Sequence, residues 1–232
     1  MTAESNQKAS DNVIAIDGPA ASGKSTVARR VAQELGRLYV DSGSLYRAVT
    51  WQTLEEGGTG DDPVAINRSL EACRLEFSAD EGRVGFKVNG RLLDRELRSD
   101  EINAHVSPVA AQPVVREQVV AWLRELTRFG ELVMEGRDIG TAVFPSARHK
   151  FYLDASPEER ARRRHKEMAD GREGAGAVDD VGASLRRRDK IDSTRKKDPL
   201  RTAPDAVIID STDLTIDQVV ARILEVVRTN EC

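Results

Sequence analysis

A glycine-rich loop near the start of the chain combines residue types that handle phosphate. Gly18 and Gly23 are separated by four residues, and Lys24 and Ser25 follow directly. The two glycines permit the backbone dihedrals by which successive N–H groups converge on an anion. A lysine at this position reaches the β- and γ-phosphates of a nucleoside triphosphate, and the serine hydroxyl ligates Mg²⁺. The spacing therefore predicts a triphosphate site with magnesium as cofactor.

The segments on either side of the loop are those that such a site needs. Residues 13–16 form an apolar run that is typical of a short buried strand. After the loop, Val27, Val31 and Leu35 recur every four residues, which predicts an amphipathic helix. The amino end of that helix would add its partial positive charge at the phosphates. A glycine turn that binds no ligand would not need a buried strand before it and an amphipathic helix after it.

Composition limits the class of protein. The 232 residues are 39% hydrophobic and 32% charged, which suits one soluble domain with inserts. No apolar run approaches the roughly 20 residues of a membrane helix, and residues 1–11 are expected to be a flexible tail rather than a signal peptide. Cys73 and Cys232 lack metal or disulfide spacing, so reduced thiols in a cytoplasmic protein are expected. The net charge of −4 argues against a dedicated nucleic-acid binder.

Basic residues are concentrated late in the chain. Between Arg160 and Arg201, Lys and Arg outnumber Asp and Glu by 14 to 8, although the whole chain carries −4. A solvated helix face is the ordinary explanation of such a run. Beside a phosphate loop, a local anionic ligand is the stronger interpretation.

Short apolar strands alternate with helices along most of the chain. Besides residues 13–16, strands are predicted at 37–41, 132–135, 150–154 and 206–210. This alternation predicts an α/β fold in which a five-stranded parallel sheet is covered by helices on both faces.

One stretch departs from the alternation. Within residues 75–88, apolar and polar side chains alternate, and Asn89-Gly90 is a strong hairpin signal. We therefore expect a small antiparallel β insert within residues 74–98. A short helix is predicted before it, at 63–73, whereas residues 99–111 show no clear periodicity.

Capping residues mark the late helices. The run 156–159 has a capping serine, then proline and glutamate at the positions that open a helix. This arginine-rich helix is expected to end near Gly171, and the glycine-rich run 171–182 to be a mobile connection. A second basic helix is predicted at 183–197, and a closing helix is predicted to begin at the capping box of residues 215–218.

A phosphate loop alone does not separate GTPases, motors, regulatory ATPases and small-molecule kinases. The guanine-reading Asn-Lys-x-Asp motif is absent, since residues 196–198 lack the asparagine. Arginines cluster after the strand predicted at 150–154, and isolated arginines follow other strands. Kinases that act on phosphorylated substrates need such groups to hold two anions together.

Five patches together resemble the bacterial cytidylate kinases, a family of nucleoside monophosphate kinases. They are residues 16–25, 41–47 (Asp-Ser-Gly-Ser-Leu-Tyr-Arg), 136–145 (Gly-Arg-Asp-Ile-Gly-Thr-x-Val-Phe-Pro), 159–164 and 188–195. The first patch is shared by a large superfamily, whereas the second, third and fifth together are typical of this family. Ala20 stands where some members carry a serine.

The resemblance implies transfer of the γ-phosphoryl group of ATP to CMP or dCMP by a monomeric enzyme that binds neither nucleic acid nor membrane. It implies a P-loop core at 12–41, 112–155 and 202–229, a monophosphate-binding region at 42–111, and a helical lid at 156–201. Two alternatives remain open from the residues alone. One is a kinase for another small acceptor, such as a different nucleotide or dephospho-coenzyme A. The other is an ATP-binding regulatory protein.

The resemblance also implies roles for individual residues. The groups expected to be catalytic are Lys24, Arg137, Arg188 and Arg195. ATP is expected to contact Gly18, Pro19, Ala20, Ala21, Ser22, Gly23, Lys24, Ser25, Thr26, Arg160, Arg163 and Arg164, with Arg162 beside them. CMP is expected to contact Ser42, Arg47, Ser107, Arg116, Arg137, Asp138, Arg188, Asp192 and Arg195. The residue expected to bind the metal is Ser25.

Spacing supports part of this set, because Arg188, Asp192 and Arg195 fall on one face of a helix. Asp17 and Asp41 end strands beside the loop, and a water-mediated contact to Mg²⁺ or helix capping would explain them. No catalytic role is expected for His105, His149 or His165. Packing roles are expected for Trp51, Trp122 and Phe129.

Overall fold

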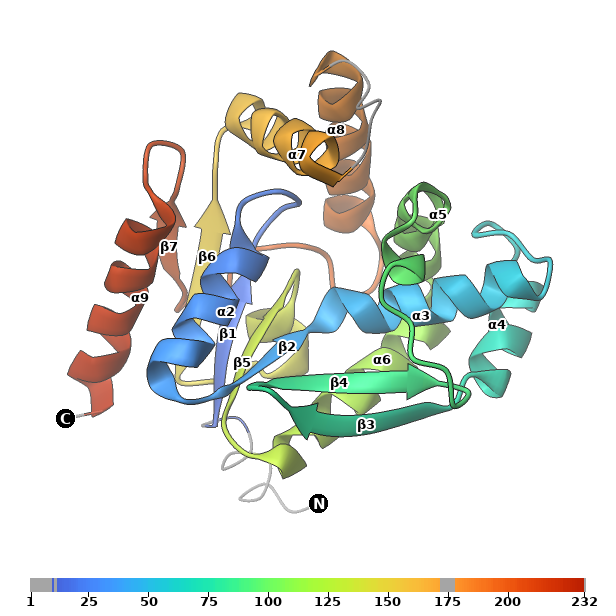
Figure 1. The fold of residues 1–232 in the computed structure, drawn as a ribbon, viewed down its shortest axis with the longest axis horizontal. Coiled ribbons are helices and arrows are strands. Elements are labelled where there is room, and N and C mark those ends of the chain that lie inside the picture. Colours follow the sequence, from blue (N-terminus) through green and yellow to red (C-terminus); the bar gives the residue numbers. More distant parts are fainter. Residues whose placement is uncertain (1–9, 11, 172–177, 232) are drawn as a thin grey trace.

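The sheet at the centre of the molecule has seven strands, and six of them run parallel. The computed structural model describes residue 10 and residues 12–171 and 178–231, and within them the strand order is β3-β4-β2-β5-β1-β6-β7. Five adjacent parallel strands are β2 (Leu38–Asp41), β5 (Leu132–Gly136), β1 (Val13–Asp17), β6 (His149–Asp154) and β7 (Val207–Asp210). The sixth parallel strand is β4 (Arg83–Val88), at the edge of β2. The predicted α/β fold is confirmed, with β1 in the middle of the parallel part (Figure 1).

The predicted antiparallel insert is present, but it is not separate from the main sheet. Strands β3 (Leu75–Asp80) and β4 (Arg83–Val88) form an antiparallel hairpin. β4 then joins the edge of β2 through a parallel pairing of Tyr39 with Arg83, and the Tyr39 amide donates to the Gly82 carbonyl at 2.9 Å. The predicted antiparallel insert is confirmed, and its attachment to β2 pairs backbone groups that this edge would otherwise leave unpaired.

Helices cover both faces of the sheet. On one face lie α2 (Lys24–Leu35) and α9 (Ile216–Glu231), and on the other lie α3 (Ser42–Glu55), α5 (Asp100–Ala111) and α6 (Pro113–Glu125), with α4 (Pro63–Ala72) beside α3 (Figure 1). Residues of β1 alternate between the two cores: Ile14 and Ile16 pack against the first pair of helices, and Val13 and Ala15 against the second group. A strand buried on both faces needs a continuous apolar run, which is the pattern its sequence shows.

Helix α5 (Asp100–Ala111) forms in the stretch whose residues show no clear periodicity. The Ser99 hydroxyl caps it by accepting from the Ile102 amide at 3.3 Å, and Pro108 lies inside it. One turn of 3₁₀ helix precedes it at Glu96–Arg98. The internal proline removes a backbone donor and weakens the helical signal in the sequence.

Two helices lie across the carboxyl ends of the parallel strands. They are α7 (Pro157–Gly171) and α8 (Val178–Thr194) (Figure 1). The predicted caps are confirmed: Ser156 accepts from the Glu159 amide, and residues 215 and 218 cap each other reciprocally at the start of α9.

The predicted limits of α8 were wrong at both ends. The helix begins at Val178 rather than 183, because Val181 and Leu185 pack against Ala20 and Ala161 and extend the turn backwards. It ends at Thr194 rather than 197. The predicted mobile connection is therefore helical at 178–182, and residues 172–177 lie outside the described residues, as does nearly all of the predicted tail 1–11.

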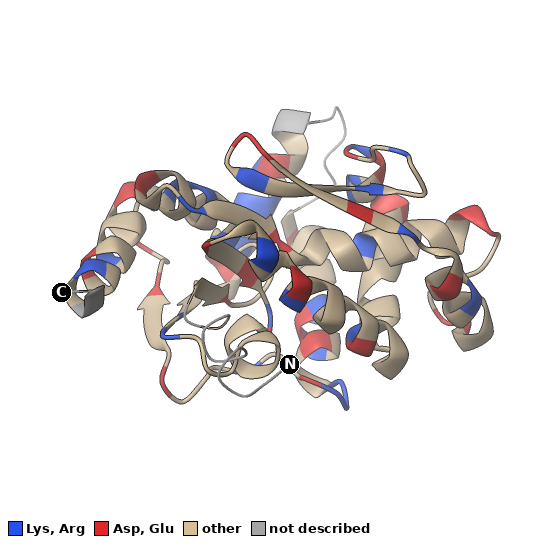
Figure 2. Cartoon of the chain, turned by 90° about the horizontal axis from the view of Figure 1, so that it is seen from below, with Lys and Arg blue, Asp and Glu red and all other residues tan. Residues whose placement is uncertain are grey.

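Lys and Arg are interspersed with Asp and Glu along the helices (Figure 2). Among the described residues, no helix combines the length and the apolar character needed to cross a bilayer. Trp51 is buried, and Trp122 and Phe129 pack against the core, as expected.

Candidate active site

The glycine-rich loop adopts the backbone that its sequence predicts. Gly18 and Gly23 have φ values of +149° and +92°, and Ala21 between them has +59°. A Cβ on Gly18 would lie 2.0 Å from the carbonyl oxygen of Leu153 on β6. Only glycine fits at position 18, because the clash is with the backbone. Helix α2 begins at Lys24, so its amino end lies at the loop.

Lys24 is buried at the mouth of this loop. Its Nζ donates to the Pro19 carbonyl at 2.5 Å and lies 3.3 Å from the Ser22 hydroxyl. Burial, and then the charge of Arg137, lowers the pKa of Lys24 to about 7, although Glu135 acts in the opposite direction. The side chain is held by neutral oxygens, which leaves its charge available to a phosphate.

A carboxylate that the sequence analysis missed lies next to Lys24 and Ser25. Glu135 is the last residue but one of β5 and is buried, and the Tyr39 hydroxyl donates to its Oε1 at 2.6 Å. Burial raises the pKa of Glu135, while Lys24 and a hydrogen bond with the Ser25 side chain lower it. A hydroxyl and a carboxylate are oxygen donors that suit Mg²⁺. The described residues contain no cluster of three or more His, Cys, Asp or Glu that could hold a metal ion.

The two aspartates that end β1 and β2 have structural partners. Asp17 is buried and accepts from the amides of Ile139 and Gly140 at 2.8 and 2.7 Å, and burial raises its pKa to about 7. Asp41 accepts from the Ser44 amide at 3.2 Å at the start of α3. The capping alternative is therefore confirmed for Asp41, and Asp17 fixes the turn that follows β5.

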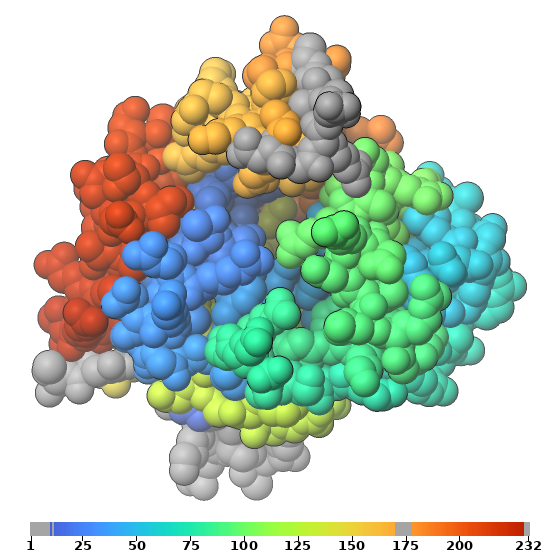
Figure 3. Space-filling view, in the orientation of Figure 1, coloured from blue at the N-terminus to red at the C-terminus, as the bar shows by residue number. Residues whose placement is uncertain are grey.

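The loop opens on a cleft between α2, α5 and the pair α7–α8, which is visible as a hollow in the molecular surface (Figure 3). Most of the predicted site residues line this cleft: Ala20, Ala21, Gly23, Lys24, Ser25, Thr26, Ser42, Arg47, Ser107, Arg137, Asp138, Arg164, Arg188, Asp192 and Arg195. Those outside its lining are Gly18, Pro19, Ser22, Arg116, Arg160 and Arg163.

Three arginines crowd together across the cleft from the loop. Burial and the neighbouring Arg137 lower the pKa of Arg188 to about 10. Burial and Arg188 likewise lower the pKa of Arg47 to about 10. Arg47 donates to neutral acceptors on Leu97 and Asn103 at 3.0 and 2.9 Å, and Arg188 Nε is buried without a partner among the described residues. Arg137 donates to Asp192 at 3.0 Å, whereas Arg47 and Arg188 have no ion pair with a carboxylate among the described residues. Positive charges held this close with only one paired carboxylate form a site for an anion.

A second cluster surrounds Asp138. Arg116 NH2 donates to Asp138 Oδ2, and Arg195 NH2 donates to Asp138 Oδ1 at 3.2 Å. Arg116 has no exposed surface, stacks over the Tyr46 ring and keeps a buried NH1 without a partner among the described residues. Burial raises the pKa of Asp138, whereas the two guanidiniums lower it. Arg116 thus lies behind Asp138, and Asp138 faces the cleft.

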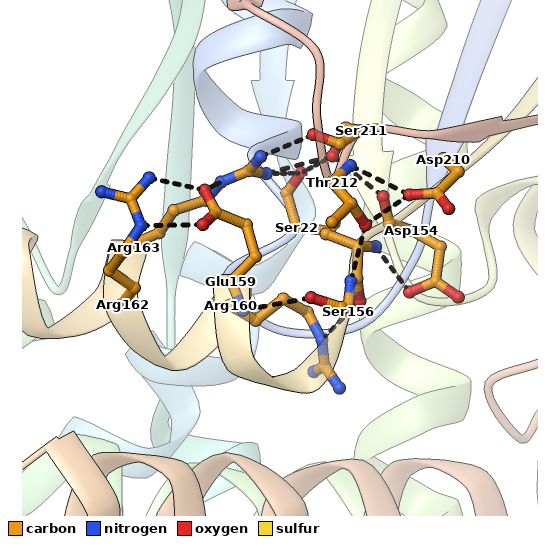
Figure 4. Close-up of polar contacts among 11 residues, drawn as sticks. Ser22, Asp154, Ser156, Glu159, Arg160, Arg162, Arg163, Asp210, Ser211 and Thr212 are labelled. Atoms are coloured by element: carbon orange, nitrogen blue, oxygen red, sulfur yellow. Dashed lines mark hydrogen bonds and ion pairs between the residues drawn. The ribbon is translucent and has the colours of Figure 1, made fainter.

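Two arginines of α7 contact the phosphate loop itself, and Figure 4 shows the contacts of Arg163. Arg163 donates to the Ser22 carbonyl at 3.3 Å and to the Ser211 hydroxyl at 3.0 Å. Arg160 donates to the Ala20 carbonyl at 3.3 Å and to Asp189 at 2.5 Å. Arg162 is exposed and pairs with Glu159. The loop and the α7–α8 pair are therefore joined by arginine hydrogen bonds to backbone carbonyls.

Comparison with known proteins identifies the family. The family model described as Cytidylate kinase matches residues 14–229. The chain belongs to the cytidylate kinase family. A cytidylate kinase of Geobacillus sp. (strain WCH70) is 46% identical over 215 residues, which are 92% of this chain and 95% of the relative. One from Mycolicibacterium paratuberculosis (strain ATCC BAA-968 / K-10) is 43% identical over 223 residues, covering 94% and 96%. A solved shikimate kinase from Acinetobacter baumannii in complex with shikimate is 20% identical, with a TM-score of 0.47 and coverage of 97% and 98%.

Family membership confirms the predicted activity. The chain is a nucleoside monophosphate kinase with cytidylate kinase activity and uses ATP. A kinase for another acceptor and a regulatory ATP-binding protein, the two alternatives left open by the residues, are set aside.

Two carboxylates of this cytidylate kinase site, Glu135 and Asp198, were not predicted from the sequence, and Asp189 lay in the patch 188–195 without a predicted role. Glu135 had a usable signal, since it follows a buried apolar run and directly precedes the Gly136-Arg137-Asp138 patch. The pairing of Asp189 and Asp198 left no local signal, because their partners Arg160 and Arg116 lie 29 and 82 residues away in the chain.

Proposed function

We propose that this cytidylate kinase acts on CMP and dCMP as a cytoplasmic monomer, with ATP and the acceptor at opposite sides of one cleft. ATP phosphates would lie on the loop amides and Lys24, and the CMP phosphate among Arg47, Arg137 and Arg188. The crowd of three arginines that faces the phosphate loop is the observation that carries this assignment.

The division of the chain is part of the same proposal. Residues 12–41, 112–155 and 202–229 form the core, and 42–111 the monophosphate-binding region. Residues 156–201 form a lid over ATP. Arg160 and Arg163 of this lid lie against the phosphate loop, because they already donate to its carbonyls. Arg164 lines the cleft and would reach the phosphates from the lid.

Ser25 and Glu135 would hold the magnesium ion. When bound, Mg²⁺ would neutralise charge on the transferring phosphoryl group. The hydroxyl of Tyr39 keeps the Glu135 carboxylate in place, so the donor set is arranged before substrate arrives.

The phosphoryl transfer itself needs no general base from the protein. An acceptor phosphate oxygen is already anionic near neutral pH, so the chain contributes positioning and charge neutralisation. Lys24, Arg137 and Arg188 are the cations that converge between the two phosphate sites. Arg195 is bound to Asp138 and to the Asp198 carbonyl, so we assign it to the base pocket rather than to the reacting phosphates.

Asp138 would read cytosine, with Ser107 as its neighbour and Arg116 fixing it from behind. A carboxylate accepts from the N4 amino group of cytosine, whereas uracil presents an acceptor at that place. Two facing acceptors cost about 1–3 kcal/mol, which favours CMP over UMP. Asp192, bound to Arg137 at 3.0 Å, would contact the ribose together with Arg188.

Replacing Arg188 with Met tests the phosphate assignment. Removing one charge-assisted contact should weaken CMP binding by about 10- to 100-fold, with ATP affinity nearly unchanged, as measured by calorimetry. The ligand-free protein should melt at a higher temperature, because the substitution relieves repulsion between Arg188, Arg137 and Arg47.

Arg187→Met is the matched control, since Arg187 is the exposed neighbour on the same helix. It should leave CMP affinity within about twofold. An equal loss of CMP affinity in Arg188→Met and Arg187→Met would contradict the assignment. So would weaker ATP binding in Arg188→Met alone.

A further inference from the structure

One residue on the connection between α8 and β7 contacts both arginines that hold Asp138. The carboxylate of Asp198 accepts from Arg116 Nε at 3.1 Å. Its main-chain carbonyl accepts from Arg195 Nε and NH2 at 2.8 and 2.6 Å. No other contact in the described structure links these two guanidiniums except Asp138 itself.

The backbone at this position is unusual and suits that double role. Asp198 has φ +47°, in the left-handed region, which aspartate tolerates better than most residues with side chains. The connection is fixed on its far side by the Leu200 amide, which donates to the Asp192 carbonyl at 2.8 Å. Asp198 is therefore held where its main-chain carbonyl accepts from Arg195 and its carboxylate accepts from Arg116.

The charges in this cluster balance only when Asp198 is counted. Arg116 and Arg195 are positive, and Asp138 and Asp198 are negative. Asp192, whose Oδ1 lies 4.0 Å from Arg195 NH1, is already paired with Arg137 at 3.0 Å. Arg116 is completely buried. A buried guanidinium without enough carboxylate seeks a bidentate contact. Without Asp198, the nearest carboxylate is Asp138, and a second Arg116 contact there would occupy lone pairs that must stay open to a base amino group.

We propose that Asp198 is a positioning residue that keeps Asp138 open to the cytosine amino group by holding Arg116 and Arg195 in place. The proposal rests on the assignment of Asp138 to the base under the proposed function. It predicts an effect on the choice of acceptor base, with the phosphate loop and ATP unaffected.

Two substitutions at this position test the proposal. Asp198→Gly removes the carboxylate and accommodates the left-handed backbone without strain. It should lower kcat/KM for CMP about 10-fold, mainly through KM, and narrow the CMP-over-UMP preference while KM for ATP stays constant. Asp198→Asn keeps an acceptor oxygen for Arg116 and should recover most of the preference. If Asp198→Gly does not fold, Asp198→Ser replaces it, because the shorter side chain does not reach Arg116.

Lys197→Met is the matched control. Lys197 pairs with Glu117 at the surface and so ties the same connection to the same helix, α6, without touching the cluster. It should leave the CMP-over-UMP preference unchanged. If Lys197→Met narrowed the CMP-over-UMP preference as much as Asp198→Gly, attachment of this connection to α6 would be enough to explain the effect, and the proposal would be overturned.

Asp138→Asn, measured in parallel, separates this inference from the base assignment. If Asp138→Asn narrows the preference and Asp198→Gly leaves it unchanged, the positioning role is refuted and the base assignment stands. If Asp138→Asn itself leaves the preference unchanged, both are refuted. Narrowing in both, with recovery in Asp198→Asn, supports the proposal.

Discussion

ATP binding should draw a proton onto Lys24. The ligand-free enzyme buries this amine beside Arg137, which lowers its pKa to about 7. A triphosphate placed against the ammonium group favours the charged form and raises the pKa again. Between pH 7 and the new, higher pKa, the bound enzyme therefore carries one more proton on Lys24 than the free enzyme.

The size of the effect follows from that pKa. At pH 8 about 0.1 of the free enzyme has a charged Lys24, and at pH 6 about 0.9. Binding should therefore take up about 0.9 proton at pH 8 and about 0.1 at pH 6. Above pH 7, ATP affinity should fall by about tenfold per pH unit through this group.

Calorimetry in two buffers of different ionisation enthalpy measures the uptake directly. Lys24→Arg is the control, because arginine stays charged throughout this range and should remove the pH 8 uptake. Protons exchanged by ATP itself or by Asp17 cancel in the difference between the two proteins. Equal uptake by wild type and Lys24→Arg at pH 8 would refute the reasoning, since Lys24 would then be charged before ATP arrives.

Two further predictions concern the frame around the loop. Gly18→Ala should destabilise the fold by about 3 kcal/mol or more, because its Cβ would lie 2.0 Å from the Leu153 carbonyl oxygen. Gly36→Ala, at φ +64° in open space, should lower the unfolding free energy by only about 1–2 kcal/mol. Urea unfolding of both variants measures the two losses, and equal losses would contradict the clash. Burial raises the pKa of Asp17 from 3.8 to about 7 in the folded state. Between pH 3.8 and 7, the folded state therefore keeps a proton on Asp17 that the unfolded state has lost. The contribution of this proton to stability is full below pH 3.8 and is lost as pH rises to 7. Unfolding free energies from pH 4 to 7 should fall by about 1 kcal/mol per pH unit more steeply in wild type than in Asp17→Asn, and parallel curves would contradict this.

Much of the fold was predictable because its signals are local. The apolar run of β1, the glycine spacing of the loop and the hairpin turns depend on a few adjacent residues. The attachment of β4 to β2 was not predictable, since it depends on a pairing of Tyr39 with Arg83 across 44 residues. The early start of α8 likewise depends on Val181 packing against the loop and α7.

The candidate site shows the same division. Motif residues such as Lys24 and Arg188 were predicted and line one cleft. The position of Arg116 behind Asp138 was not predicted, because it depends on a buried ion pair between residues that are 22 positions apart in the chain. Roles that depend on which partner a charged group finds in the folded chain are not encoded in spacing alone.

The central place of β1 has a consequence for biosynthesis. Its two neighbours in the sheet, β5 and β6, begin at Leu132 and His149, so the ribosome must add 118 residues (14–131) after Val13 before β5 starts. At about 5–20 residues per second, this interval lasts roughly 6 to 24 seconds. Throughout it, an apolar strand that ends fully buried has none of its native sheet partners, and it forms an aggregation-prone segment of the nascent chain. The strand that places the phosphate loop at the middle of the sheet is therefore also the one that nascent-chain chaperones would need to protect longest.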